Sequence, residues 1–276
     1  MPGTLNLFEL LGGLALSLSI GALGHRRGAL SGSGFWGALI TGTLIFGFGG
    51  WEWGVLLIAF FLSSSALSFY RSPDKQGLAE KFAKGHRRDL GQALANGGLA
   101  ALLAVLSWWR PHPLWFFGCA GAMAAVNADT WATELGVLSP SPPRLVTTGR
   151  RVEVGASGGV TWLGTGASLA GALLIGLLAG AGALVLRQGW TVAVGALLAA
   201  AVGGLTGSLI DSLLGATVQA IYWCDMCGKE TERRVHRCGT ETRLLRGWRW
   251  LGNDWVNVIS SAVGALVAAG IGLIVL

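Results

Sequence analysis

Long apolar runs recur along this chain and constrain its fold more than any other feature. A helix needs about 20 apolar residues to cross a bilayer, and runs of about that length follow one another from end to end. Only 12% of the 276 residues are charged, about half the share found in soluble domains. Backbone N–H and C=O groups must be satisfied internally in lipid, so such runs are expected to be helices. The sequence therefore predicts an all-α polytopic membrane protein.

Eight transmembrane helices are predicted. Their approximate ranges are 5–23, 34–50, 53–69, 91–108, 113–137, 157–186, 190–221 and 253–275. No basic segment precedes the first run, so we expect a membrane span there rather than a cleaved signal peptide. The 45 glycines suit close packing of helices, because small residues let helix backbones approach one another.

The basic residues sort to one side of these spans. The loops after spans one, three, five and seven hold two, six, three and seven of the 20 lysines and arginines, and only Arg110 and Arg187 fall on the other side. Cytoplasmic loops carry such an excess, so we expect both termini outside. The membrane accounts for the positive charge, and no nucleic-acid partner is expected. The host membrane is the plasma membrane, or the thylakoid in a phototroph.

Two pairs of segments resemble each other at equivalent positions. Residues 26–34 resemble 150–158, and residues 88–96 resemble 249–257. We therefore expect a single membrane domain, 1–276, built from two parallel four-helix repeats, about 1–110 and 111–276. The alternative is chance similarity in a chain rich in Gly, Ala and Leu.

Polar residues gather where spans five, seven and eight reach the inner surface. Carboxylates at the edge of hydrocarbon are costly and usually face a bundle interior or cavity. Carboxylate oxygens also suit Mg²⁺, which is often held together with substrate phosphates. Interfacial caps or bonds between helices are the simpler reading of any one residue. The residues concerned are Asn127, Asp129, Thr130, Thr133, Glu134, Ser208, Asp211, Ser212, Gly215, Gln219, Asn253, Asp254 and Asn257.

Two neighbouring features suit anions. Ser157, Gly158, Gly159 and Thr161 open span six just after a pair of arginines, and backbone N–H groups at a helix start can bind an anion. A cationic cluster precedes span four, and it suits either anionic lipid or phosphorylated substrates. Its members are Lys81, Lys84, His86, Arg87 and Arg88.

The loop over 222–250 contains Cys224, Cys227, His236 and Cys238. A pair two residues apart followed by His and Cys is typical of a small structural zinc knuckle. The loop is expected in the cytoplasm, where disulfides are disfavoured. A redox pair and unliganded thiols are the alternatives. Cys119 lies within span five, where packing is expected.

In combination, these motifs resemble one known family. The segments NADTWATELG (127–136), GASGGVT (155–161), GSLIDSLLGATVQ (207–219) and WLGNDWVN (250–257) are similar to the membrane family that includes phytyl-phosphate kinase and transmembrane protein 19. The resemblance implies transfer of a phosphoryl group from a nucleoside triphosphate, plausibly CTP, to phytyl phosphate or another isoprenyl monophosphate. The product would be a diphosphate for tocopherol or related prenyl-lipid synthesis.

Together with the residue patterns, the resemblance leads to a predicted site that faces the cytoplasm. Asp129, Glu134, Asp211 and Asp254 would hold Mg²⁺. Asn96, Asn127, Asn253 and Asn257, with Ser208 and Gln219, would orient ligands. Arg87, Arg88, Arg150 and Arg151 would bind phosphates with the 155–161 segment.

Other functions remain open at this stage, as do the lipid chain length and the oligomeric state. A membrane lipid-phosphate cytidylyltransferase would use the same groups but release pyrophosphate. An ion-coupled transporter would also need acids within the membrane. A structural protein has no need of so many buried acids.

Overall fold

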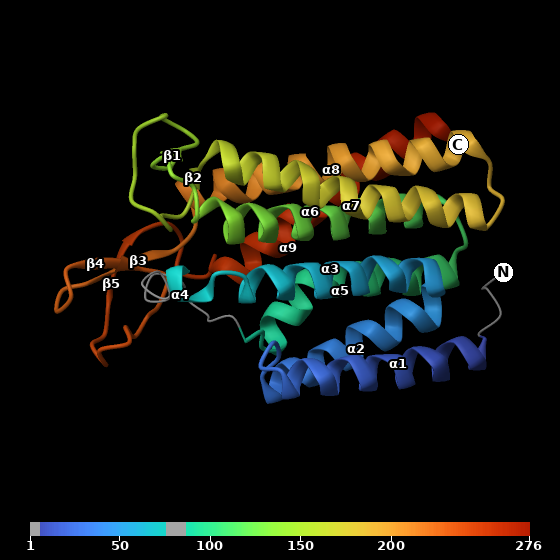
Figure 1. Cartoon of the computed structure of the whole chain (residues 1–276), viewed down its shortest axis with the longest axis horizontal. Coiled ribbons are helices and arrows are strands. Elements are labelled where there is room, and N and C mark those ends of the chain that lie inside the picture. Colours follow the sequence, from blue (N-terminus) through green and yellow to red (C-terminus); the bar gives the residue numbers. More distant parts are fainter. Residues whose placement is uncertain (1–5, 76–86) are drawn as a thin grey trace.

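Long helices run side by side through the computed structural model, which describes residues 6–75 and 87–276 (Figure 1). The helices are α1 (Leu7–Arg26), α2 (Gly32–Gly49), α3 (Trp51–Phe69), the short α4 (Ser72–Lys75), α5 (Leu90–Trp109), α6 (Leu114–Gly136), α7 (Trp162–Val185), α8 (Trp190–Thr217) and α9 (Asn253–Val275). Five short strands gather at one end, namely β1 (Arg144–Leu145), β2 (Gly159–Val160), β3 (Ile221–Cys224), β4 (Lys229–Thr231) and β5 (Arg243–Arg246).

The described part thus holds eight long helices, one in each predicted range. Six are long and apolar enough to cross a membrane. The other two, α2 and α6, have 18 and 23 residues. In α6 the polar residues near its end lower the hydropathy. The protein is therefore a helical membrane protein, and a count of eight crossings stays a prediction.

The largest differences from the predicted helix boundaries are at α7 and α8. Helix α7 begins at Trp162 rather than at 157, because the Thr161 side chain accepts a hydrogen bond from the N–H of Gly164 and caps the helix. Gly158 before it has a φ of +80°, a left-handed conformation that ends regular structure. Helix α8 ends at Thr217 rather than at 221, since the chain turns there into β3.

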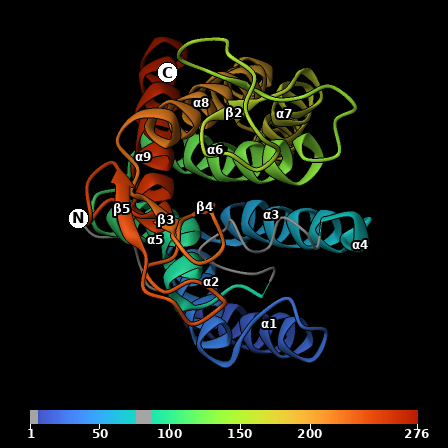
Figure 2. The ribbon, with the colours of Figure 1, turned by 90° about the vertical axis from the view of Figure 1, so that its left-hand side faces the viewer.

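The two halves of the bundle pack differently. Helices α6, α7, α8 and α9 form a tight unit in which α6 contacts each of the other three. In the first half, α1 packs along α2 and α2 along α5, while α3 lies mainly against α6 (Figure 2). The packing of the second half is thus not repeated in the first. Two repeats in the sequence stay a prediction.

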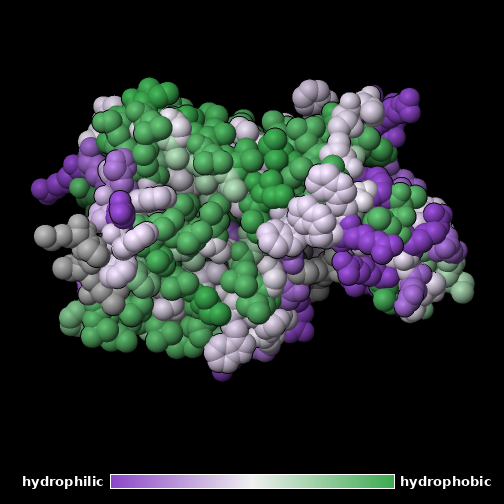
Figure 3. All heavy atoms as spheres, turned by 180° about the vertical axis from the view of Figure 1, so that it is seen from behind, coloured by the Kyte–Doolittle hydropathy of each residue, from purple (hydrophilic) through white to green (hydrophobic). Residues whose placement is uncertain are grey.

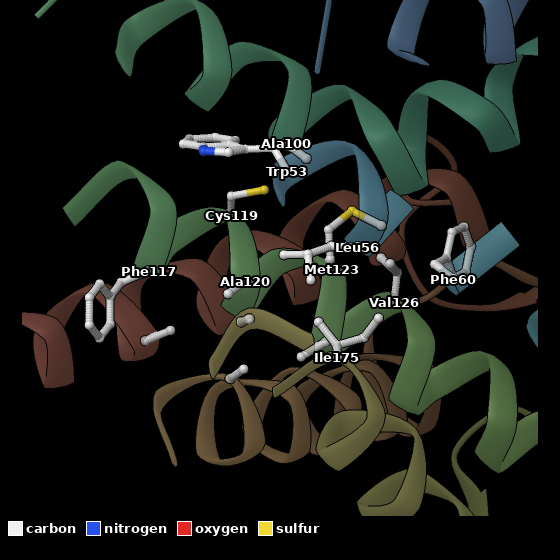
Figure 4. Packing of buried hydrophobic residues seen from close by; sticks show 14 of the residues in the cluster. Trp53, Leu56, Phe60, Ala100, Phe117, Cys119, Ala120, Met123, Val126 and Ile175 are labelled. Carbon is white, nitrogen blue, oxygen red and sulfur yellow. The ribbon is translucent and has the colours of Figure 1, made fainter. Parts of the chain in front are cut away.

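Glycines bring the helices of the second half into contact. Gly121 of α6, Gly203 of α8 and Gly264 of α9 lie at one crossing, where a Cβ on Gly203 would stand 2.6 Å from the carbonyl oxygen of Gly264. Only residues without a side chain allow such an approach. The apolar core lies beside this crossing and is built around Trp53, Phe117, Met123 and Ile175 (Figure 4). Cys119 is buried within it, as expected for a packing residue.

The surface divides into an apolar band and a polar end. Apolar side chains cover the middle of the molecule, and hydrophilic residues crowd the end that carries the strands (Figure 3). The N- and C-termini lie at the opposite end of the bundle (Figure 1). Trp162 and Trp190 are largely exposed at helix ends, where membrane proteins carry aromatic belts. The loops expected to be cytoplasmic therefore share one face.

A single methyl group at the glycine crossing should destabilise the bundle. We expect Gly264→Ala to lower the free energy of unfolding by about 1–3 kcal/mol, because the new Cβ would lie 2.8 Å from the carbonyl oxygen of Gly121. Gly270→Ala is the matched control on α9, since nothing lies within 4 Å of its Cβ position. Thermal unfolding of both variants in detergent measures the difference, and equal midpoints would contradict the packing described.

Candidate functional site

A large polar cavity opens at the strand-bearing end of the bundle. Its volume is about 640 Å³, and its walls come from α3 through α9 and from the loops that follow α6 and α8. Most of the polar residues predicted to form the site line this cavity. Its lining includes Arg88, Asn96, Asp129, Thr130, Thr133, Glu134, Ser157, Gly158, Gly159, Thr161, Ser208, Asp211, Ser212, Gly215, Gln219, Asn253 and Asn257.

Two carboxylates lie close together in the lining of the cavity. Asp129 comes from α6 and Asp211 from α8, and their side chains lie within hydrogen-bond reach of one another. The hydroxyl of Ser260 in α9 donates to Oδ2 of Asp211 at 3.3 Å. Two such groups cannot both stay charged in an apolar setting unless a cation lies between them; otherwise the pair takes up a proton. The pair therefore has the chemistry of a cation site.

Glu232 is a third acid at this place, and the sequence analysis missed it. It follows β4 directly, in the cysteine-containing loop, and its charge interacts with Asp129 and Asp211. Its Oε1 accepts hydrogen bonds from Ser157 at 3.0 Å and from Gln219 at 2.9 Å. The residue had no sequence signal, because it lies among the other charges of a polar loop and only the fold brings it to the membrane.

The base of this loop is fixed to the end of α8. The backbone N–H of Trp248 donates to the carbonyl of Val218, and Arg246 donates to the carbonyl of Gly215 at 2.8 Å. Gly247 has a φ of +82° and lies so close to Gln219 that a side chain would collide with the backbone there. Glu232 is thereby held over the cavity.

The cavity also carries basic groups. Lys75, Arg88 and Arg237 line it. Lys75 forms an ion pair with Glu134 at 2.6 Å, and Ser68 donates to the same carboxylate at 2.5 Å. Glu134 thus has a cation of its own, away from the acids around Asp211. The cavity thus carries both acidic and basic groups.

Arg88 is almost fully buried and has the most constrained of these side chains. Its guanidinium donates to the hydroxyls of Ser64 and Ser65 at 3.0 Å each and lies over the rings of Phe60 and Phe61. These partners are all neutral, while Glu134 acts on it at longer range. Burial lowers the pKa of this guanidinium, yet an arginine stays protonated in proteins. A fixed cation here suits an anionic ligand.

The glycine-rich segment before α7 serves largely to build the wall. The Thr161 hydroxyl caps α7, and Ser157 binds Glu232. Gly158 packs against α8, since a Cβ on it would stand 2.5 Å from the backbone nitrogen of Ala216. Gly159 pairs with Leu145 in the β1–β2 ribbon. These residues line the cavity as predicted, while their hydroxyls have structural partners.

Some predicted residues lie elsewhere. Asn127 is buried beneath the cavity, where it donates to the carbonyl of Gly171 at 2.8 Å and accepts from Ser63 at 3.1 Å. Asp254 is in the first turn of α9, where a negative charge stabilises the helix, and it is not among the described cavity residues. Three arginines, Arg87, Arg150 and Arg151, are exposed outside the cavity. The predicted Lys81, Lys84 and His86 lie outside the described residues.

The cysteine loop forms a compact cluster of metal-binding groups. Ligand atoms of Cys224, Cys227, His236 and Cys238 all lie within 4.8 Å of one another. The sulfurs of Cys224 and Cys238 are 3.6 Å apart, close to the separation of about 3.8 Å that two thiolates have around a tetrahedral zinc. Hydrogen bonds with Thr240 and His236 lower the pKa of Cys238 to about 6. A thiolate is the form that binds metal, so the residues present fit a zinc ion.

Fold and cavity together define a class, a helical integral membrane protein with a charged cavity at one membrane surface. The chain belongs to the family described as integral membrane protein DUF92, whose model matches residues 15–265. No solved structure matches it.

Relatives of the chain occur in a plant and in an archaeon. Protein PGR of Arabidopsis thaliana is 34% identical and aligns over 92% of each chain. Uncharacterized membrane protein MJ0933 of Methanocaldococcus jannaschii is 36% identical over 68% of this chain and 74% of its own. Protein VTE6, chloroplastic, of Arabidopsis thaliana is 29% identical over 87% of this chain and 64% of its own.

The ion pair between Lys75 and Glu134 should contribute to stability. Its side chains are 13% and 20% exposed, so Lys75→Met would leave a largely buried carboxylate without its cation and cost about 1–3 kcal/mol. The double variant Lys75→Met, Glu134→Gln should recover much of that loss. The exposed pair Arg71–Asp74 is the control, since Arg71→Met should cost less than about 1 kcal/mol. Equal losses in thermal unfolding would contradict this account.

Proposed function

We propose that the protein is an integral membrane isoprenyl-phosphate kinase. It would transfer the terminal phosphoryl group of a nucleoside triphosphate, plausibly CTP, to phytyl phosphate or a related isoprenyl monophosphate. The resemblance of its motifs to the phytyl-phosphate kinase family supports this activity. The observation that carries the proposal is the cavity at the strand-bearing end of the bundle, which both acidic and basic side chains line.

The reaction needs positioning and charge neutralisation more than covalent chemistry. A phosphate oxygen of the lipid attacks the γ-phosphorus of the nucleotide. The bond between that phosphorus and its bridging oxygen breaks, and the nucleoside diphosphate leaves with the electron pair. The attacking phosphate is already ionised, so no strong general base is required.

The acidic and basic residues of the cavity suit the positioning and the charge neutralisation that this reaction needs. Asp129 and Asp211, with Glu232 beside them, are the residues that would hold Mg²⁺, which supplies neutralising charge to nucleotide phosphates. The basic residues Arg88, Lys75 and Arg237 would bind phosphate oxygens. Asn96, Asn253 and Asn257 also line the cavity and offer amide groups to orient the ligands.

The transporter alternative needs a polar path through the membrane. The core beyond the cavity is apolar instead, from Trp53 and Leu56 to Phe117 and Met123. A lipid-phosphate cytidylyltransferase would fit the same cavity, and the products distinguish it. That enzyme releases pyrophosphate and keeps the α-phosphoryl group with the lipid, whereas a kinase passes on the γ-phosphoryl group.

Labelled nucleotide tests the proposal directly. With purified protein, phytyl phosphate, Mg²⁺ and γ-labelled CTP, label should appear in lipid diphosphate. Asp211→Asn should lower the rate at least about 100-fold, in the range seen when one electrostatic group of an active site is removed. Asp225→Asn is the control, because Asp225 lies exposed in the cysteine loop and pairs with Arg243. If no isoprenyl monophosphate yields a diphosphate with any nucleoside triphosphate while the protein stays folded, the proposal fails.

We also propose that the cysteine loop binds one structural zinc ion. The ligands would be Cys224, Cys227, His236 and Cys238. Because β4 lies between Cys227 and Glu232 in the chain, an ordered cluster would help to hold that acid over the cavity.

Metal analysis tests the zinc proposal. The purified chain should contain about one zinc per molecule, and Cys224→Ser should lose it, because structural sites need all four ligands. Cys119→Ser is the control, since Cys119 is buried in the membrane core. Full zinc content in the Cys224→Ser variant would refute the assignment, as would none in the wild type.

A further inference from the structure

A second, narrow pocket adjoins the polar cavity. It lies between α1, α2, α3 and α5 and has a volume of about 60 Å³. Apolar residues such as Leu16, Ile20, Ala38 and Ile58 line it. The hydroxyl of Thr41, also in its wall, donates to the carbonyl of Gly37 at 2.9 Å and so is satisfied within its own helix.

The pocket opens beside a helix pair that packs weakly. Helix α1 packs along α2, and α2 along α5, whereas α1 and α3 are not among the closely packed pairs of described helices. The helices α2 and α5 thus form a floor, with α1 and α3 as the sides. Leu16 is 37% exposed on the outer surface, so this wall borders the lipid-facing side.

The two pockets meet at three polar residues. Arg88, Gln92 and Asn96 line both of them. The Arg88 guanidinium stands at this junction, held by serine hydroxyls and the rings of Phe60 and Phe61. A ligand that fills both pockets therefore carries an anion at the junction and a hydrocarbon chain on one side of it.

We propose that this apolar pocket binds the first part of the hydrocarbon chain of a lipid monophosphate, whose phosphate is bound by Arg88. The rest of the chain passes between α1 and α3 into the bilayer. The charge of Arg88 is complementary to the phosphate, and the narrow bore suits a single chain. The assignment rests on the proposed function, because it names where the acceptor lipid of that reaction lies.

Binding without nucleotide tests the assignment apart from catalysis. Phytyl phosphate is titrated into the purified full chain, and Ala38→Phe is compared with Ile40→Phe. The first substitution fills the pocket. The second introduces the same phenylalanine side chain on the same helix, at a residue that is 47% exposed and lies outside the pocket lining. We expect Ala38→Phe to weaken binding about tenfold, as when the burial of about two methylene groups is lost, and Ile40→Phe to change it less than about twofold.

Chain length and labelling locate the occupant. The effect of Ala38→Phe should be small for dimethylallyl phosphate, whose short tail scarcely leaves the polar cavity. A phytyl phosphate carrying a diazirine near its phosphate should label Ile58 or Phe61. Labelling of lipid-facing residues instead would overturn the assignment, as would equal binding by both variants. The assignment would also be overturned if a bilayer phospholipid were retained in the pocket and phytyl phosphate did not displace it.

The two proposals fail in different ways. If phytyl phosphate binds with this pattern but no nucleotide phosphorylates it, the kinase proposal fails and the pocket assignment stands. If the wild type makes the diphosphate and Ala38→Phe has an unchanged KM for phytyl phosphate, the pocket assignment fails and the kinase stands. Unchanged nucleotide binding by Ala38→Phe shows that the variant is folded.

Discussion

The cost of placing charge in an apolar bundle governs the design of this protein. Asp129, Asp211 and Glu134 lie on helices whose other surfaces face core or lipid, and a charged group there needs a partner. The structure meets this need by placing all of these acids in a single cavity at one end of the bundle, which basic side chains also line. Glu134 has Lys75 as its partner. Asp129 and Asp211 lie within reach of one another, with the charge of Glu232 nearby, which is why a cation is the natural third member of that pair.

The same constraint explains why the cysteine loop belongs to the site. The acids of this bundle lie toward the ends of their helices, and helix ends alone do not enclose a cavity. The loop after α8 closes it from outside, and its fixed base brings Glu232 to Ser157 and Gln219. A folded extramembrane element thus supplies a residue that no transmembrane segment supplies. Zinc in that loop would then act on the site through the position of Glu232, without touching a substrate.

The sequence predicted the bundle well because period and length act locally. Each long apolar run became a helix, and the loop charges were enough to place all four basic loops at one end. It also predicted that residues as distant as Asn96, Asp129, Asp211 and Asn257 meet. It could not predict Glu232, because nothing in the loop distinguishes that acid from its neighbours until the strands are paired. The prediction for Asn127 was wrong although its sequence signal was clear. Asn127 shares a helical face with Thr130 and Glu134, but it lies one turn deeper, where its amide forms hydrogen bonds with Gly171 and Ser63.

The two halves of the bundle pack differently, and this difference suits them to different roles in the site. Tight glycine crossings make α6, α7, α8 and α9 a rigid unit, which suits the side that must hold two carboxylates within reach of each other. The first half is looser, and α1 is joined to the rest mainly through α2. Looser packing leaves room for a hydrocarbon chain that enters from the bilayer. Arg88 lines both the narrow pocket of this half and the polar cavity. In the proposed reaction, a lipid phosphate would thus reach this point through the membrane and a nucleotide would reach it from water.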